Sequence, residues 1–211
     1  YYKFNMSIEI KRSIKPVDYN KAIIFLEKRL EKVANGGANE LIWFLEHNEV
    51  YTGGTSYKKS EILDQSINVI KSSRGGKITH HSPGQLVCYF VINLSKRNKD
   101  IRKFIISIEK SIIGTFKEFK IKTNNDRKNV GIWVNHNNES KKIASIGIKV
   151  RKWIAYHGFA ININNNLSNF DKIIPCGLKG KKITSLDQIS NITYESFIKK
   201  LEKKIVKNLS L

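Results

Sequence analysis

Cysteine, proline and methionine are scarce in this chain of 211 residues, which contains two Cys, three Pro and one Met. The two cysteines have no Cys-x-x-Cys or Cys/His spacing, which argues against a structural zinc site. The low proline content, with 40% hydrophobic residues, excludes collagen-like, low-complexity and largely disordered chains. Long hydrophobic runs are missing as well. The longest, residues 86–94, is interrupted by Asn93 and falls far short of the roughly 20 residues that a membrane-spanning helix needs.

The N-terminus lacks the charged start and apolar segment of a secretory signal, so the sequence predicts a reducing, cytoplasmic compartment. A disulfide between Cys88 and Cys176 is disfavoured there. Because the only methionine is Met6, residues 1–6 are expected to be a remnant of cloning or processing. Residues 7–211 show no linker, repeat or change of composition, which predicts a single domain.

Acidic residues are few: 18 Asp and Glu stand against 38 Lys and Arg, a net charge of +20. A field of this sign attracts polyanions or acidic proteins. The basic residues are dispersed in short pairs such as Lys58-Lys59, and a general bias toward Lys, Ile and Asn explains the charge as well as a function does. No zinc-finger or RNA-binding signature is present. Charge alone therefore leaves open a nucleic-acid-binding module and an enzyme with an acidic protein substrate.

Helical and strand patterns alternate irregularly along the chain. Asp18, Asp100 and Thr193 are predicted to precede helices, and residues 101–119 form the longest apolar stripe at helical spacing. Strands are predicted at residues 7–11, 41–45, 50–51, 67–70, 86–94, 130–134, 143–150, 153–163 and 183–186. Asn135 to Asn138 predict a hairpin turn. The mixture indicates an α+β (α/β) fold class, with one mixed sheet and helices packed on it.

Three segments carry residues suited to chemistry. The first, residues 74–85, is a glycine-rich turn in which Gly75 and Gly76 would let the backbone approach a ligand closely. By itself it is equally an ordinary hairpin with surface histidines. In the second, residues 142–150, strand alternation puts Lys142 on the apolar face of Ala144, where its amine either reaches water or stays desolvated with a lowered pKa.

The third segment is the turn Pro175-Cys176-Gly177. A cysteine at a sharply bent, exposed backbone is better placed to act as a nucleophile than to pack, although a loop cysteine without a role explains it equally well. Cys88, flanked by apolar residues in a predicted strand, is interpreted as a core residue.

Together these segments resemble the lipoyl(octanoyl) transferases of lipoate biosynthesis, which move an octanoyl group from acyl carrier protein to a lysine of lipoyl domains. The resemblance rests on Arg-Gly-Gly, Thr-x-His and Pro-Gly-Gln within residues 74–85, Lys-Ile-Ala-Ser-Ile-Gly at 142–147, His-Gly-x-Ala at 157–160 and Pro-Cys-Gly at 175–177. An upstream Glu46-His47 fits the same pattern. The order and spacing agree over roughly residues 40–187.

The resemblance implies a fold shared with biotin and lipoate ligases, and a catalytic dyad of Cys176 and Lys142. Cys176 would carry the acyl group as a thioester, and Lys142 would lower the pKa of the thiol or take its proton. The substrate-binding positions implied are Arg74, Gly75, Gly76, Lys77, Ile78, Thr79, His80, His81, Ser145, Ile146, Gly147, Gly158, Phe159 and Ala160.

The implied partners are octanoyl acyl carrier protein as donor, with lipoyl domains of 2-oxoacid dehydrogenases and the glycine cleavage H protein as acceptors. No cofactor or metal is expected, and neither a membrane nor a nucleic acid is an expected partner. Two alternatives are an ATP-dependent lipoate-protein ligase of the same fold and a basic nucleic-acid-binding module. The ligase would need no nucleophilic cysteine, which makes Cys176 the discriminating residue.

Overall fold

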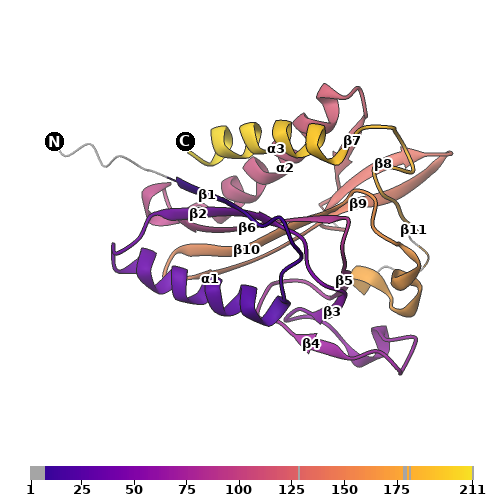
Figure 1. Ribbon diagram of the computed structural model, residues 1–211, viewed down its shortest axis with the longest axis horizontal. Coiled ribbons are helices and arrows are strands. Elements are labelled where there is room, and N and C mark those ends of the chain that lie inside the picture. The colour runs from indigo at the N-terminus through magenta and orange to yellow at the C-terminus, as the bar shows by residue number, and fades with distance from the viewer. Residues whose placement is uncertain (1–7, 128, 178–179, 181, 211) are drawn as a thin grey trace.

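A mixed β-sheet separates the helices of this protein into two layers (Figure 1). The computed structural model describes residues 8–127, 129–177, 180 and 182–210, with Cys176 described by its backbone alone. The N-terminal segment expected to be a remnant, residues 1–6, lies outside the described residues. Helix α1 (Tyr19–Ala34) covers one face of the sheet, and helices α2 (Ile101–Glu118) and α3 (Tyr194–Leu209) cover the other.

The main sheet has the strand order β1-β2-β6-β10-β9-β8-β7, with β11 paired to β9. Its strands are β1 (Ile8–Arg12), β2 (Glu40–Leu45), β6 (Gln85–Asn93), β7 (Thr123–Asn125), β8 (Ile132–His136), β9 (Glu139–Arg151), β10 (Ile154–Asn162) and β11 (Lys182–Ile183). The pairs β1–β2 and β9–β11 are parallel, and the other neighbours are antiparallel. The predicted mixed sheet is therefore confirmed.

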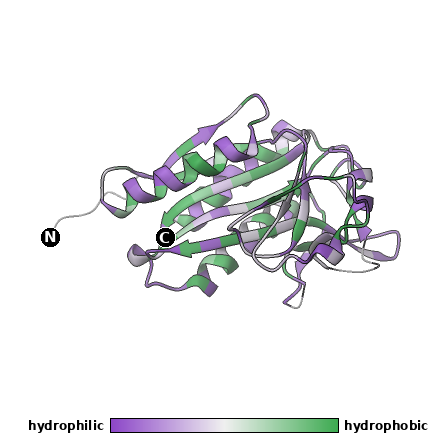
Figure 2. Ribbon diagram, turned by 90° about the horizontal axis from the view of Figure 1, so that it is seen from below, coloured by the Kyte–Doolittle hydropathy of each residue, from purple (hydrophilic) through white to green (hydrophobic). Residues whose placement is uncertain are grey.

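The central strands are hydrophobic on both faces because each face is covered by helix. Along β6, Cys88 and Phe90 belong to the core beneath α2 and α3, while Val87 and Tyr89 belong to the core beneath α1. In Figure 2 the hydrophobic colour runs along the central strands, and hydrophilic stretches alternate with hydrophobic ones along the helices. Cys88 is fully buried, as predicted for a core residue.

The helix starts follow the predicted caps. The side chains of Asp18 and Asp100 accept hydrogen bonds from the third residue that follows, each at 2.9 Å, and Thr193 does so at 3.3 Å. Each cap satisfies one of the backbone N–H groups that a helix start leaves unpaired. Within the described residues, no helix combines the length and the hydrophobicity needed to traverse a bilayer.

A second, three-stranded sheet was not predicted. It consists of β4 (Val69–Lys71), β3 (Val50–Gly53) and β5 (Ile78–His81), with β3 in the middle. Its strands have only three or four residues, too few for a periodic pattern to reveal which strand pairs with which. The prediction of one sheet was therefore wrong in this region, where the main sheet is accompanied by a smaller one.

Short elements complete the chain. The 3-10 helices are η1 (Lys59–Glu61), η2 (Leu94–Lys96), η3 (Ser168–Lys172) and η4 (Pro175–Gly177). The predicted hairpin joins β8 to β9, and its turn residues Asn137 and Asn138 have φ of 52° and 60°. Asparagine tolerates this left-handed region better than most residues, which is why the Asn run identified the turn.

Candidate active site

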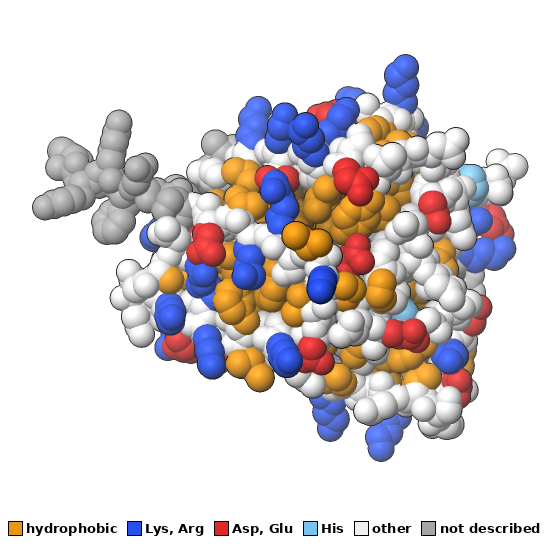
Figure 3. Space-filling view, viewed as in Figure 1, with side chains coloured by type: hydrophobic (Ala, Val, Ile, Leu, Met, Phe, Trp, Pro, Cys, Tyr) orange, Lys and Arg blue, Asp and Glu red, His pale blue; other side chains and the backbone are white. Residues whose placement is uncertain are grey.

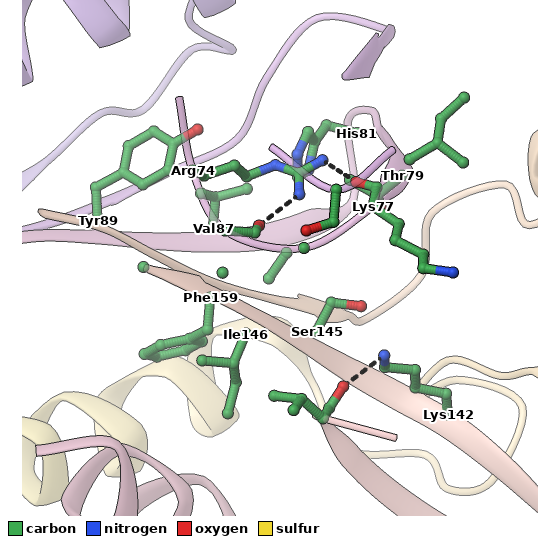
Figure 4. Close-up of a pocket in the computed structure, with 18 of the residues that line it drawn as sticks. Arg74, Lys77, Thr79, His81, Val87, Tyr89, Lys142, Ser145, Ile146 and Phe159 are labelled. Carbon is green, nitrogen blue, oxygen red and sulfur yellow. Dashed lines mark hydrogen bonds between the residues drawn. The ribbon is translucent and has the colours of Figure 1, made fainter. Parts of the chain in front are cut away.

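A cavity of about 310 Å³ lies between the small sheet and strands β6, β10 and β9. This volume is at the lower end of the roughly 300–1,000 Å³ typical of small-molecule sites. Its lining comprises Ser56, Arg74, Gly75, Gly76, Lys77, Ile78, Thr79, His81, Val87, Tyr89, Asn129, Val130, Lys142, Ser145, Ile146, Gly147, Gly158, Phe159 and Ala160. The structure thus gathers the predicted substrate-binding residues around one cavity, with the exception of His80. Figure 4 shows this arrangement.

The cavity floor consists of two rows of residues that pair across the three strands. One row is Val87, Ala160 and Ser145, and the next is Tyr89, Gly158 and Gly147. Residues two apart in a strand share a face, so both rows point to the same side of the sheet. A Cβ added at Gly147 would lie 3.0 Å from the carbonyl oxygen of Gly75. The glycine therefore allows the residue 72–77 loop to pass close over the sheet.

Arg74 holds this loop in shape. Its guanidinium donates hydrogen bonds to the carbonyls of Thr52 at 2.8 Å, Lys77 at 2.9 Å and Gly75 at 3.0 Å, and to the Thr52 hydroxyl at 2.9 Å. Figure 4 shows the bonds from Arg74 to the two loop carbonyls. The bonds to Thr52 tie the same side chain to β3 of the small sheet. The planar, multiple-donor geometry of arginine suits this role better than the point charge of lysine.

A second anchor of the loop comes from the sheet. His157 has a left-handed φ of 66°. Its Nε2 lies 3.1 Å from the Ser73 hydroxyl oxygen. Left-handed backbone at a non-glycine residue stores strain and is found where a fold holds it in place. Burial is the main factor that lowers the pKa of His157, to about 3, with Arg74 and Lys149 contributing, so the imidazole is neutral at physiological pH.

Lys142 reaches the cavity because of a β-bulge. Ile132 of β8 pairs with Ala144, while the next residue, Trp133, pairs with Lys142. One extra residue in β9 therefore reverses the alternation at this point. The prediction that Lys142 shares the apolar face of Ala144 was wrong for this reason. Ala144 joins the core beneath α2 and α3, whereas Lys142 faces the cavity with Trp133 beside it.

The Lys142 side chain is 4% exposed, so it does not reach solvent. Its Nζ donates a hydrogen bond of 2.7 Å to the Val130 carbonyl and lies 5.6 Å from the centre of the Trp133 ring. Both contacts are ones that an ammonium group makes.

Sequence reasoning missed Gly131, where an added Cβ would lie 2.3 Å from Lys142 Cε. The sequence does carry a signal for this residue, because a glycine inside a strand pattern marks a place where another part of the chain approaches the backbone closely.

The side chain of Cys176 lies outside the described residues, and with it the predicted contact to Lys142. The backbone of its turn, η4, packs against β5. A Cβ at Gly177 would lie 2.2 Å from the Nζ of Lys77, which lines the cavity and forms a 3.2 Å ion pair with Glu61. A few residues later, Ile183 pairs with Lys142. Two described residues that follow Cys176 therefore lie beside cavity-lining lysines: Gly177 beside Lys77, and Ile183 beside Lys142.

The two adjacent histidines of β5 face opposite ways. His81 lines the cavity, and its Nδ1 donates to the Gln85 side chain at 2.6 Å. Burial holds the pKa of His81 well below 6.5, so the ring is neutral. His80 instead packs between Tyr51 and Phe170, with ring centres 4.7 and 5.6 Å away. Strand alternation thus removes His80 from the cavity, and its position does not support the predicted substrate contact.

Five lining residues were missed by sequence reasoning: Ser56, Val87, Tyr89, Asn129 and Val130. Val87 and Tyr89 belong to a strand that is buried throughout. A continuously apolar strand gives no sign of which face borders a cavity.

Comparisons with known proteins identify the family of this chain. The family model of the lipoyl protein ligase A/B catalytic domain matches residues 18–206. An octanoyltransferase of Ehrlichia ruminantium (strain Gardel) is 44% identical over 195 residues, which cover 91% of this chain and 94% of the relative. Another, of Wolbachia pipientis wMel, is 43% identical over 174 residues, or 82% of this chain and 85% of the relative.

The structure of a bi-partite lipoate protein ligase and its E2 lipoyl domain from Thermoplasma acidophilum contains a similar chain. The TM-score is 0.74 at 12% identity, with 97% of this chain and 84% of that chain covered. This likeness shows the fold alone, and it confirms the predicted fold class. Because the family model spans most of the sequence and the relatives are alike over most of their length, the chain belongs to the lipoyl protein ligase A/B catalytic domain family.

Proposed function

We propose that residues 7–211 form one catalytic domain that transfers an octanoyl group from octanoyl acyl carrier protein to the lysine amine of a lipoyl domain, through a thioester on Cys176. The observation that carries the proposal is the buried amine of Lys142 at a cavity with two lining lysines close to the chain after Cys176: Lys77 lies beside Gly177, and Lys142 pairs with Ile183. The names of the octanoyltransferase relatives support the same reaction.

In the first half-reaction the Cys176 thiolate attacks the carbonyl carbon of the donor thioester. The tetrahedral intermediate collapses, the bond from the carbonyl carbon to the carrier sulfur breaks, and the carrier thiolate takes a proton. A neighbouring Lys142 ammonium favours the thiolate form of Cys176 and can supply that proton. The products are the octanoyl thioester of Cys176 and the free carrier thiol.

In the second half-reaction the lysine amine of the lipoyl domain attacks the Cys176 thioester. The new amide bond forms as the bond to the Cys176 sulfur breaks, and the attacking amine loses a proton to the now neutral Lys142. Lys142 returns to its ammonium form and Cys176 to its thiolate. No co-reactant is consumed in the cycle, which distinguishes it from an ATP-dependent ligase.

The cavity suits an alkyl chain. Val87, Ile78 and Ala160 contribute apolar surface, and Gly158 and Gly147 leave room above the sheet. Burying about seven carbons at roughly 0.8 kcal/mol each contributes on the order of 5–6 kcal/mol to acyl binding. This is enough for the cavity to discriminate between acyl chains of different length.

The basic surface suits acidic protein partners. Figure 3 shows Lys and Arg side chains spread over the face in view, in keeping with a net charge of +20. Dispersed positive charge accelerates the encounter with acidic proteins. Acidic carrier and lipoyl domains therefore fit as donor and acceptors. A free nucleophilic thiol also fits a reducing, cytoplasmic compartment.

Intact-mass spectrometry tests the proposal. Incubation with octanoyl acyl carrier protein and no ATP should add one octanoyl mass to the protein, and a lipoyl domain added next should acquire that mass. Cys176→Ser should lose the thioester and Lys142→Ala should slow its formation. Cys88→Ala is the matched control, because Cys88 is fully buried and its removal should leave the adduct intact.

Two outcomes would contradict the proposal. Transfer that needs ATP and survives in Cys176→Ala would favour a ligase. Tight DNA binding that weakens steeply with salt, without any acyl adduct, would favour a nucleic-acid-binding module.

A further inference from the structure

We propose that Tyr89, held in place by His47, is the end wall of the acyl pocket and sets the preferred length of the acyl chain. The inference rests on the octanoyl transfer proposed for this site. It gives a role to Tyr89, which no sequence motif singled out, and to His47, which was identified only as part of a motif.

The cavity runs along the strands from Lys142 to the row that contains Tyr89. Lys142 is followed on the same face by Ser145, which pairs with Ala160, and then by Gly147, which pairs with Gly158 beside Tyr89. With the bulged pair counted as one step, the distance from Lys142 to Gly147 is four steps, or about 13 Å at roughly 3.3 Å per residue.

An octanoyl group fits this distance. Its seven carbon–carbon bonds, each about 1.5 Å long and arranged in a zigzag, span about 9 Å. The remaining length of about 4 Å accommodates the thioester at the Lys142 end. A chain bound there would bring its terminal methyl group to the row of Tyr89.

The next row along the strands is closed. It consists of Val91, Tyr156 and Lys149, of which Val91 and Tyr156 are at most 1% exposed. On the side of the loop, Gly75 donates to the Ile148 carbonyl at 3.1 Å, and Ser73 lies beside His157. A longer chain therefore meets side chains and backbone where an octanoyl chain ends.

Tyr89 is fixed by hydrogen bonds on its far side. Its hydroxyl lies 2.8 Å from Nε2 of the buried His47, whose Nδ1 donates to the Val17 carbonyl at 2.7 Å. With Nδ1 as the donor, Nε2 must accept the proton of the phenol. Burial lowers the pKa of His47 and raises that of Tyr89, so both remain neutral. The ring cannot swing aside without leaving these buried groups unpaired.

Single-turnover acylation with hexanoyl, octanoyl, decanoyl and dodecanoyl carrier protein tests the inference. The wild-type protein should prefer octanoyl. Tyr89→Ala opens a space bordered by His47, Trp43 and His157, and two further buried methylenes should raise the decanoyl-to-octanoyl rate ratio roughly tenfold. Tyr89→Phe separates the bulk of the ring from its fixation: it keeps the ring but loses the bond to His47, so its ratio should rise by less than that of Tyr89→Ala.

Two further variants test the same inference if Tyr89→Ala does not fold. Tyr89→Leu keeps an apolar side chain and should move the ratio in the same direction by less. Val87→Leu adds bulk one row closer to Lys142 and should raise the hexanoyl-to-octanoyl ratio. Wild-type acylation by octanoyl with unchanged ratios in Tyr89→Ala and Tyr89→Leu would overturn the inference. Failure of the wild-type protein to accept any acyl chain would instead overturn the proposed transfer reaction.

Discussion

Gly131→Ala tests whether the position of Lys142 matters for the reaction. A Cβ at this residue would lie 2.3 Å from Lys142 Cε and 2.5 Å from the Ala144 carbonyl oxygen. The carbonyl belongs to the main sheet and cannot yield easily, so the lysine side chain must move by about 1 Å or more to restore normal contact at roughly 3.5 Å. The φ of Gly131, 141°, is also unfavourable for alanine and adds about 1–3 kcal/mol of strain.

The expected effect is large. Displacement of a catalytic group by 1 Å can lower a rate by about 100-fold. We therefore expect acyl-enzyme formation to slow by about that factor in Gly131→Ala. Alkylation of Cys176 by iodoacetamide as a function of pH provides a second measurement, since Cys88 is fully buried and burial raises the pKa of its thiol well above the usual value. On the proposed dyad, displacement of the Lys142 ammonium should raise the alkylation midpoint of Cys176 toward about 8.5.

Gly36→Ala is the matched control. Gly36 also has a positive φ, 74°, but an added Cβ would meet nothing within 4 Å. It should lose about 1–2 kcal/mol of stability to backbone strain and keep the wild-type acylation rate and alkylation profile. A folded Gly131→Ala protein with a wild-type rate and an unchanged alkylation midpoint would refute the reasoning.

Three further predictions concern the loop, pH and salt. Arg74→Lys keeps the charge but loses the multiple bonds to Thr52 and Lys77, so it should cost about 2–3 kcal/mol in unfolding free energy and weaken donor binding, measured as an increase in KM. His81 and His157 have pKa values below the ordinary 6.5, so the unfolded chain takes up protons first as the pH falls. Stability is therefore full above pH 6.5 and should fall by about 1.4 kcal/mol per pH unit for each histidine below that value. Thermal unfolding should show this slope, and His157→Phe should make it shallower. Finally, the net charge of +20 predicts that KM rises with ionic strength; a KM independent of salt would contradict electrostatic steering.

Much of the fold could be predicted because its signals are local. The caps Asp18, Asp100 and Thr193 bond to N–H groups three residues away, and the Asn137-Asn138 turn depends on the conformational preference of those two residues. Strand boundaries were less accurate. The last predicted strand, 183–186, is only Lys182–Ile183 in the structure, because β11 pairs with β9 over two residues. Pairing between distant segments determines where a strand ends.

The composition of the site could be predicted from its motifs, whereas the orientation of its side chains could not. Lys142 faces the cavity because of an extra residue opposite Trp133, and alternation read from the sequence assigns it to the wrong face. His80, one residue from His81, turns toward Phe170 because β5 pairs with β3 in a small sheet whose existence the sequence did not predict.

The sequence by itself thus determined the helices, their caps, the hairpin turn and the residue types that chemistry requires, since each depends on neighbours within a few positions. The tertiary structure decided the register, the bulge, the second sheet and the place of Tyr89 at the end of the cavity. Those features depend on pairing between segments far apart in the chain, and a shift of one residue in such pairing moves a side chain to the opposite face of a strand.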